Sequence, residues 1–271
     1  MAGMLLPPFA LLGGEAALAQ PPYAFANAEA ETLVAAMTMP PNGARRALID
    51  TFVGALKTAG VWSKIDVMWV LAAHDEQAGR LNWKSPGSFT LTAVNAVTFT
   101  VDRGFAGNGS SSYLDTGWAR LINGTGFTQD AAHISVYQRT SPNGNEAVSE
   151  NTGGFRLAVN AGAGNLSRAK LNSSVELQAP AGGALPTHVI ARRNDSTNAS
   201  LVRDGVEVLA PTAAASSSFG GGTVRIGVRG TGTFVSSQVA MLTLGAYLTD
   251  PDCLSLYDAS NDYLVVLVDG I

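Results

Sequence analysis

Paired carboxylates are the first chemistry to look for in this sequence, because two of them held close together can act as acid and nucleophile in glycoside hydrolysis. The glutamates Glu146, Glu150, Glu176 and Glu207 stand apart from one another, and the chain contains no Glu-x-Asp-x-x-Glu pattern. A serine nucleophile has no support either, because no G-x-S-x-G turn occurs between a strand and a helix. We therefore predict that the protein is not an enzyme.

Histidine and cysteine are too sparse to form a zinc site. His74, His133 and His188 lie far apart, and Cys253 is the single cysteine, so it cannot form a disulfide within the chain. The polar cluster at positions 74–76 follows an apolar run. We interpret it as a turn that closes a strand, because no second histidine or cysteine stands at ligand spacing.

Loop oxygens offer a second route to a metal site, since calcium prefers carboxylate and amide oxygens. The residues that could supply them are Asp102, Asn108, Asp115, Asn194 and Asp195. Aspartate and asparagine beside glycine are also the usual turn formers, and we favour that interpretation. We expect neither a metal nor a cofactor.

Aromatic rings and planar donors are the side chains suited to holding a sugar, because rings stack on pyranose faces and guanidinium groups bind hydroxyls in pairs. The candidates for carbohydrate binding are Tyr113, Trp118, Tyr137, Arg192 and Arg193. Aromatic residues make up only 7% of the chain, so few stacking surfaces are available. Any binding through them is predicted to be weak at a single site.

The charge of the chain excludes several partners. Charged residues make up 14% and the formal net charge is −4, so no basic patch can neutralise phosphates and we expect no nucleic-acid partner. No stretch reaches the roughly 18 uninterrupted apolar residues of a membrane-spanning helix. Ala17-Leu-Ala19 mimics a cleavage site, but no Lys or Arg precedes the apolar run and Pro7-Pro8 interrupts it, so we do not expect a signal peptide.

Strand patterns dominate the chain after residue 87. Asp204-Gly205 lies between β-branched runs and supplies the positive φ angles of a two-residue hairpin turn. Val224, Ile226 and Val228 alternate with polar residues, which is typical of a sheet with one buried face. Similar alternation occurs at 89–94, 97–101, 132–139 and 187–193, separated by turn residues. We predict a mainly β fold, an antiparallel β-sandwich.

Three segments are predicted along the chain. Residues 1–41 form an extended Pro- and Ala-rich arm. Residues 42–86 form a helix, capped by Asn42, and a junction with a buried strand at 65–71. Residues 87–271 form the sandwich, which ends in a short helix to about 260, begun by a capping box of Thr249 and Asp252, and a closing strand at 263–268. The arm cannot form a core by itself. We expect its apolar side chains to pack mainly on other chains: Leu5, Phe9, Leu12, Tyr23 and Phe25.

The order of several short motifs resembles the laminin-G or concanavalin-A-like jelly roll. The motifs are Tyr-Leu-Asp-Thr-Gly at 113–117, the strands at 133–139 and 188–193, Arg-Asp-Gly-Val at 203–206, Arg-Ile-Gly at 225–227, and Gly-Ala-Tyr-Leu at 245–248 before a helix with Leu-Tyr at 256–257. The segment from residues 61–66 to Trp83, together with residues 99–105 and 107–109, is similar to bacteriophage and prophage structural proteins that carry such a sandwich. The resemblance covers about residues 45–265.

This resemblance implies a non-enzymatic virion component, such as a fibre, spike or decoration protein. It further implies a homo-oligomer that attaches to other virion proteins through the arm and whose jelly roll binds a host-surface polysaccharide. Two alternatives stay open, because a fold alone does not establish binding. One is a secreted lectin or carbohydrate-active enzyme, and the other is a purely structural decoration protein without a ligand.

Overall fold

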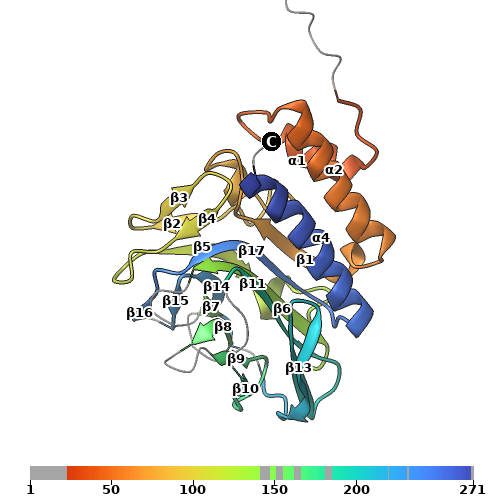
Figure 1. The fold of residues 1–271 in the computed structure, drawn as a ribbon. Helices are drawn as coiled ribbons and strands as arrows, with labels where there is room; N and C mark the ends of the chain where they lie inside the picture. The colour runs from red at the N-terminus through yellow and green to blue at the C-terminus, as the bar shows by residue number, and fades with distance from the viewer. Residues whose placement is uncertain are drawn as a thin grey trace, which may run out of the picture.

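The structure of the chain is a computed structural model that describes residues 23–140, 147–150, 155–161, 166–180, 185–218, 220–230 and 232–269. Within these residues, strands form two large antiparallel sheets that pack face to face (Figure 1). The predicted antiparallel β-sandwich is thereby confirmed. No helix in the described part of the chain is long and apolar enough to cross a membrane.

The larger sheet has eight strands, and β17 is its central strand because it pairs with three others, β1, β6 and β4. Its strands are, in order, β13 (Val206–Ala213), β12 (Asn198–Arg203), β11 (Thr187–Arg193), β6 (Ala132–Thr140), β17 (Gln238–Gly245), β4 (Gly104–Ala106) and β3 (Thr98–Thr100), with β1 (Ile65–Val70) also paired to β17.

The smaller sheet has seven strands. They are, in order, β10 (Leu177–Ala179), β9 (Leu166–Lys170), β8 (Arg156–Ala161), β7 (Val148–Glu150), β14 (Thr223–Ile226), β5 (Tyr113–Ala119) and β2 (Thr92–Val94). A two-stranded hairpin, β15 (Val228–Arg229) and β16 (Thr233–Phe234), follows β14. The short helical elements are η1 (Trp62–Lys64), η2 (Ala78–Arg80) and α3 (Arg120–Asn123).

The core between the sheets follows from the two-residue period of a strand. In β5, Leu114, Thr116 and Trp118 are buried, whereas the intervening residues Tyr113 and Asp115 keep part of their surface. One ion pair lies inside this core: the guanidinium of Arg120 donates to the carboxylate of Glu150 at 2.5 Å and lies over the ring of Phe155. A buried pair of this kind is stable only because both partners are held in place.

Three helices cover the other face of the eight-stranded sheet: α1 (Ala28–Ala35), α2 (Gly43–Thr58) and α4 (Asp250–Asp269) (Figure 1). Their apolar sides bury a second cluster with sheet residues such as Met68, Ile190 and Met241. The Asn42 side chain caps α2 by accepting a hydrogen bond from the Arg45 amide at 2.9 Å, as predicted from its position before the helix. The central strands of the eight-stranded sheet, β6, β11 and β17, are therefore buried on both faces.

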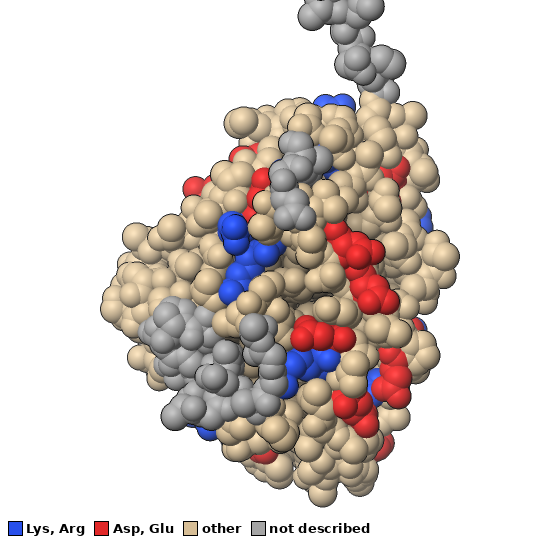
Figure 2. Space-filling model, in the orientation of Figure 1, with Lys and Arg blue, Asp and Glu red and all other residues tan. Residues whose placement is uncertain are grey.

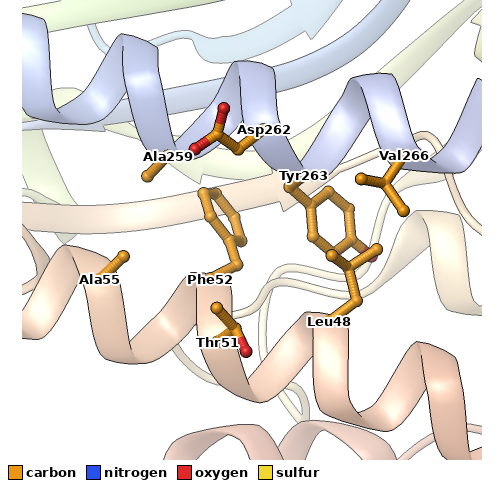
Figure 3. A pocket seen from close by; sticks show the side chains of 8 residues that line it. All are labelled: Leu48, Thr51, Phe52, Ala55, Ala259, Asp262, Tyr263 and Val266. Atoms are coloured by element: carbon orange, nitrogen blue, oxygen red, sulfur yellow. The ribbon is translucent and has the colours of Figure 1, made fainter.

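Helices α2 and α4 pack through aromatic side chains. The rings of Phe52 and Tyr263 stack with centroids 5.0 Å apart (Figure 3). Trp83 meets both rings edge-on at 5.6 Å. Beside them runs an apolar groove of about 170 Å³. Burial of these large rings fixes the distance between the two helices.

The predicted closing strand at 263–268 is wrong, because these residues form the last turns of α4. Leu256, Ser260, Leu264 and Leu267 are buried at helical spacing, whereas Val265 and its neighbours on the outer side are exposed. No residue that would end a helix lies between the predicted short helix and residues 263–268, so the helix continues through them. The β-branched valines gave the run its strand-like composition.

The prediction that residues 1–41 pack mainly on other chains is wrong for the described part of that segment. Residues 28–35 form α1, and Leu33, Val34 and Met37 are buried against the same chain. Tyr23 donates a hydrogen bond to Asp50 on α2 at 3.0 Å, and its ring meets that of Phe25. Leu5, Phe9 and Leu12 lie outside the described residues.

The predicted strands at 89–94 and 97–101 do not pair with each other. β2 pairs with β5 in the smaller sheet, whereas β3 pairs with β4 in the larger one. Asn95, with a φ of 57°, turns the chain from one sheet to the other. The short Asn95-Ala96 connection therefore links the two layers instead of closing a hairpin.

The predicted hairpin turn at Asp204-Gly205 is confirmed, with φ angles of 48° and 78° at these two residues between β12 and β13. Gly205→Ala should destabilise the protein by about 1–3 kcal/mol, because a Cβ at this φ is strained and would lie 2.7 Å from the Leu254 side chain on α4. Urea denaturation measures this loss.

The matched control for this substitution is Gly60→Ala. Gly60 has a similar φ of 72°, but a Cβ there meets nothing within 4 Å. It should cost only the backbone strain, about 1 kcal/mol. An equal loss for both variants would show that the turn does not press against α4.

Two buried histidines make stability depend on pH. Burial lowers the pKa of His133 to about 4 and that of His188 to about 3, from an ordinary value of 6.5. Both rings stay neutral in the fold but take up protons in the unfolded chain below pH 6.5, so stability is full above that pH and falls below it. We expect a loss of about 1.4 kcal/mol per pH unit for each histidine between pH 6 and pH 5, measured by urea denaturation.

The variant His188→Phe separates the two contributions. The His188 ring lies between those of Tyr137 and Tyr257, and within the described residues neither ring nitrogen has a hydrogen-bond partner, so phenylalanine fits the same space. Stability at neutral pH should be kept or raised, and the slope below pH 6.5 should fall by half. An unchanged slope would contradict the assignment.

Candidate functional site

The outer face of the seven-stranded sheet is the candidate site. The helices α1, α2 and α4 cover the other sheet, whereas this face carries half-buried polar residues from β5, β8, β9 and β14. The strand period places them together, since Leu114, Leu157, Ala169 and Val224 point into the core and their neighbours point outward.

One group of side chains on this face, which we call the Tyr113 cluster, consists of Tyr113, Asp115, Thr223, Arg225 and Phe234. The guanidinium carbon of Arg225 lies 5.0 Å from the centroid of the Tyr113 ring. Its Nε donates to Asp115 Oδ2 at 3.1 Å, and the Thr223 hydroxyl donates to the same oxygen at 3.1 Å. Phe234 stacks on Tyr113 with centroids 6.3 Å apart. An aromatic pair, a fixed guanidinium and a fixed carboxylate thus share one surface.

A second polar group lies along the same face on β8 and β9, three and four strands from β5. Arg156 on β8 forms an ion pair with Glu176, and Arg168 on β9 approaches the same carboxylate at 4.0 Å. Gln178 donates to Glu176 Oε1 at 3.1 Å. With neighbouring strands about 4.8 Å apart, β9 and β5 are separated by about 19 Å, which is the length of an oligosaccharide and not of a single sugar.

The β15–β16 hairpin contacts the face between these two groups. The Ser149 hydroxyl on β7 donates to the Val228 carbonyl at 2.7 Å and accepts from the Gly230 amide at 3.2 Å. Gly227, with a φ of 90°, allows the chain to turn from β14 into this hairpin. The hairpin places Phe234 on the Tyr113 ring and so completes the cluster.

Two of the aromatic residues predicted to bind sugar are corrected by their burial. Trp118 is 1% exposed and meets Phe127 edge-on inside the sandwich. Tyr137 is 3% exposed and lies beneath α4, where its hydroxyl donates to Asn261 at 3.3 Å. Neither ring offers a face to a ligand, because both faces are already packed.

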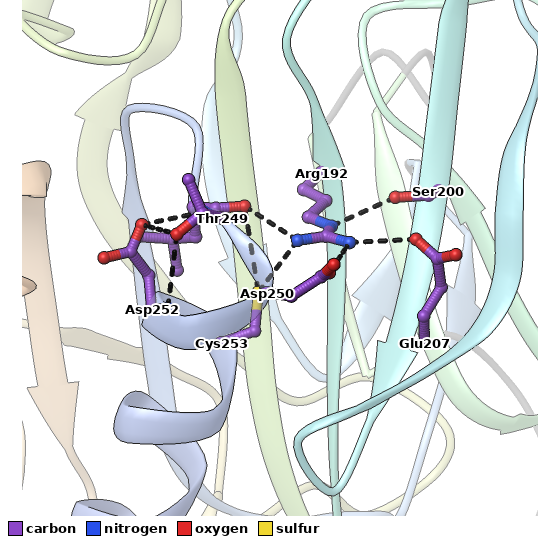
Figure 4. Close-up of polar contacts among 8 residues, drawn as sticks. Arg192, Ser200, Glu207, Thr249, Asp250, Asp252 and Cys253 are labelled. Carbon is purple, nitrogen blue, oxygen red and sulfur yellow. Dashed lines mark hydrogen bonds and ion pairs between the residues drawn. The ribbon is translucent and has the colours of Figure 1, made fainter.

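Arg192 is also engaged within the fold. Its guanidinium donates to Ser200, to the Leu248 carbonyl at 3.0 Å and to Glu207 at 2.9 Å, and it forms an ion pair with Asp250 at the start of α4 (Figure 4). Thr249 and Asp252 form the predicted capping box, in which the Asp252 carboxylate accepts from the Thr249 amide at 2.7 Å. Arg192 therefore fastens the N-terminus of α4 to β11, β12 and β13.

Arg193 points away from the helices and is buried at the end of the sandwich. Its Nη2 donates to the Ala214 carbonyl at 2.6 Å, and its Nε and Nη1 have no hydrogen-bond partner among the described residues. Burial lowers its pKa, although Asp130 and Asp195 act in the opposite direction. Of the five predicted sugar-binding residues, only Tyr113 lies on the outer face.

The loop oxygens considered for calcium do not converge. Asp102 forms a salt bridge with Arg45 at 2.7 Å, and Asp115 belongs to the Tyr113 cluster. Asp195 accepts hydrogen bonds from Thr197 and Asn198 in its own turn, which lowers its pKa to about 2. Within the described ranges, no group of three or more His, Cys, Asp or Glu side chains is placed to hold a metal ion.

Sequence reasoning did not single out Arg225 and Phe234 as site residues. The position of Arg225 on the polar face could have been predicted, since it alternates with the apolar residues Val224 and Ile226. The position of Phe234 could not have been predicted from its neighbours, because it depends on the turn at Gly227. Figure 2 shows a largely uncharged surface with separate groups of acidic and basic side chains, and α4 carries Asp258 and Asp262 and no Lys or Arg.

Replacing Arg192 should destabilise the fold without touching the outer face of the seven-stranded sheet. Arg192→Met leaves the Leu248 carbonyl unpaired and releases the start of α4, so we expect a loss of about 2–4 kcal/mol by urea denaturation. Glu207→Gln is the control, since that carboxylate lies at the solvent edge of the network, and it should cost less than about 1 kcal/mol. Equal stabilities of Arg192→Met and the unsubstituted protein would show that the network does not hold α4.

Comparison with known proteins gives a fold and no family. No family model and no curated protein sequence matches the chain. Among solved structures, a botulinum neurotoxin type C structure, described by its dependence on two ganglioside molecules for cell entry, aligns with a TM-score of 0.54 at 10% identity over 74% of this chain and 52% of the toxin chain. At such low identity the likeness shows a shared β-sandwich and nothing more.

Two further structures align less closely. Domain 4 of an extracellular arabinanase from Geobacillus stearothermophilus, in complex with arabinotriose, has a TM-score of 0.49 and 12% identity over 72% of this chain and 98% of that domain. A Trypanosoma rangeli sialidase has a TM-score of 0.48 and 14% identity over 82% of this chain and 40% of its own. The chain thus spans about half of the toxin and two fifths of the sialidase.

Proposed function

We propose that this protein is a non-enzymatic glycan-binding module, and that it binds through the outer face of the seven-stranded sheet. The observation that carries the proposal is the Tyr113 cluster, in which Arg225 is held between the Tyr113 ring and the Asp115 carboxylate on a surface that no described helix covers. Fixed planar donors, fixed acceptors and aromatic edges are the groups that bind sugar hydroxyls and ring faces.

The dimensions of the face favour an extended polysaccharide over a single sugar. The Tyr113 cluster and the group of Arg156, Arg168 and Glu176 both present polar side chains, and the outermost strands that carry them, β5 and β9, are about 19 Å apart. A chain of several sugars can contact both. Botulinum neurotoxin type C, one of whose structures shares this sandwich, is described as dependent on interaction with two ganglioside molecules for cell entry, and this supports a glycan as the ligand class to test.

Binding without hydrolysis fits the state of the carboxylates on this face. Asp115 accepts from Arg225 and Thr223, and Glu176 pairs with Arg156. Glycoside hydrolysis needs one carboxyl group that donates a proton and a second one within about 5–10 Å of it. Both carboxylates here are paired with arginine, and they lie on opposite sides of the β15–β16 hairpin.

The setting we propose is a bacteriophage-type virion, in which the protein is a homo-oligomeric fibre, spike or decoration component. The motif resemblance to phage structural proteins supports this setting. The apolar residues at 5, 9 and 12 would contact other virion proteins. Many copies on one particle would convert weak single-site binding into firm adhesion through effective concentration.

A binding experiment with purified protein tests the proposal. The protein is applied to an array of bacterial surface polysaccharides, and we expect a dissociation constant of about 0.1–1 mM per site, or about 4–5.5 kcal/mol. Arg225→Ala and Tyr113→Ala should each weaken binding at least about tenfold, because they remove the fixed donor and the ring that supports it.

Lys57→Ala is the matched control, since Lys57 lies on α2, away from the outer face of the seven-stranded sheet, and pairs with Glu29 at the surface. It should bind as the unsubstituted protein does. A well-folded protein that binds no surface polysaccharide would refute the proposal and leave the purely structural role. Hydrolysis of a bound polysaccharide would instead support the carbohydrate-active enzyme.

A further inference from the structure

The two polar groups on the outer face of the seven-stranded sheet differ in charge. In the Tyr113 cluster, the guanidinium of Arg225 contacts the carboxylate of Asp115 at 3.1 Å, so one positive charge meets one negative charge. The second group lies on β8, on β9 and just before β10. Its charged residues within the described part of the chain are Arg156, Arg168, Lys170 and Glu176. Three positive charges there meet one negative charge.

The two-residue period of a strand places the basic side chains side by side. Ala169 is buried in the core between the sheets, so Arg168 and Lys170 on either side of it point outward. Two residues along a strand are separated by about 6.8 Å. Arg156 on β8 lies directly opposite Lys170 in the antiparallel pair. The three cations therefore share one small area of the sheet.

The carboxylate of Glu176 is already engaged. Its Oε2 forms an ion pair with Arg156, and its Oε1 accepts a hydrogen bond from Gln178 at 3.1 Å. The Nε of Arg168 lies 4.0 Å from Oε1, which is too far for a hydrogen bond, and 34% of the Arg168 side chain is exposed. Lys170 forms no ion pair with any described residue. Arg168 and Lys170 are thus available to an incoming anion.

This concentration of positive charge has a cost that nearby residues do not offset. Like charges directly opposite each other on an antiparallel pair, as at Arg156 and Lys170, destabilise a sheet. The stretches 151–154, 162–165 and 181–184 adjoin these strands in the sequence and contain no Asp or Glu. The formal net charge of the chain is −4, so its composition does not account for a positive area either. A bound anion would remove the repulsion.

We infer that the polysaccharide bound by this face is acidic, and that Arg168 and Lys170 hold its carboxylates while the Tyr113 cluster contacts an uncharged part of it. The inference rests on the proposed function, because it names the ligand class of the same face. A guanidinium binds a carboxylate through two parallel hydrogen bonds, and an ammonium group adds a point charge.

The array of bacterial surface polysaccharides tests this inference when each uronic-acid polysaccharide is applied in two forms. One form is native, and in the other the carboxylates have been reduced to alcohols, which keeps the sugar backbone and removes the charge. The native form should bind at least about tenfold more tightly. Raising the salt concentration from about 0.05 M to about 0.5 M should weaken its binding, because salt screens exposed charges.

The outcomes separate this inference from the proposed function. Equal binding of the two forms, or binding confined to neutral or phosphate-bearing polysaccharides, overturns the inference and leaves a glycan-binding face in place. A well-folded protein that binds no polysaccharide refutes the proposed function itself.

Calorimetric titration of the native polysaccharide with charge variants tests the assigned residues. Arg168→Met and Lys170→Met should each weaken binding about three- to tenfold, and Lys170→Arg should keep it, because arginine stays charged. Glu176→Gln should strengthen binding, since it removes a carboxylate that repels the ligand. Urea denaturation confirms that each variant is folded.

Lys57→Met is the matched control, because it removes the same charge from α2, away from this face. It should bind as the unsubstituted protein does. If Lys57→Met and Lys170→Met weakened binding equally, or if Glu176→Gln weakened it, the assignment of the carboxylate to β9 would be overturned.

Discussion

Burial of the central strands of the eight-stranded sheet on both faces is the constraint on which the rest of this structure depends. Its central strand β17 pairs with β1, β6 and β4, and from Val239 to Gly245 every residue is buried. The backbones meet so closely that a Cβ at Gly245 would lie 2.1 Å from the Lys64 carbonyl, and one at Gly104 would lie 2.1 Å from the Val239 carbonyl. Glycine is required at both positions, because a side chain there would collide with the backbone of the neighbouring segment.

Burial of the central strands of the larger sheet on both faces also decides where a ligand can bind. The helices α1, α2 and α4 occupy the outer side of the larger sheet, so polar residues that point that way from β6 and β11 are cut off from water and depend on partners inside the protein. Arg192 finds them in Asp250 and Glu207, and His133 in Thr243 and the Ala246 carbonyl. His188 is an exception, because neither ring nitrogen has a hydrogen-bond partner among the described residues. The smaller sheet has no such cover among the described elements, and its outer face keeps polar side chains half-exposed.

Local patterns in the sequence were sufficient for much of the fold. The Asn42 cap, the buried strand β1, the turn at Asp204-Gly205 and the capping box at Thr249 each depend on residues within a few positions of one another, and each was predicted correctly. The sandwich itself followed from strand alternation. The continuation of α4 through residues 263–268 was missed because valine runs are common to buried strands and to packed helices.

The candidate site was harder to predict, because it depends on which sheet face is covered. Trp118, Tyr137, Arg192 and Arg193 have the right chemistry for sugar, but neighbours distant in sequence bury all four. Alternation of polar and apolar residues in β6 indicated one wet face, whereas α4, more than a hundred residues later, covers it. Tyr113 and Arg225 stay on the outer face because no described helix packs over β5 and β14.

The position of α4 in the chain has a consequence for synthesis on the ribosome. Residues 250–269 follow β17, so the side of the larger sheet that holds Ile190, Met241 and Tyr137 stays uncovered until the chain has been made to about residue 269 and has left the exit tunnel. During that interval the nascent protein presents an apolar sheet surface with α1 and α2 alone to shield it. Molecular chaperones recognise such surfaces, and translation that stops before α4 leaves a product prone to aggregation.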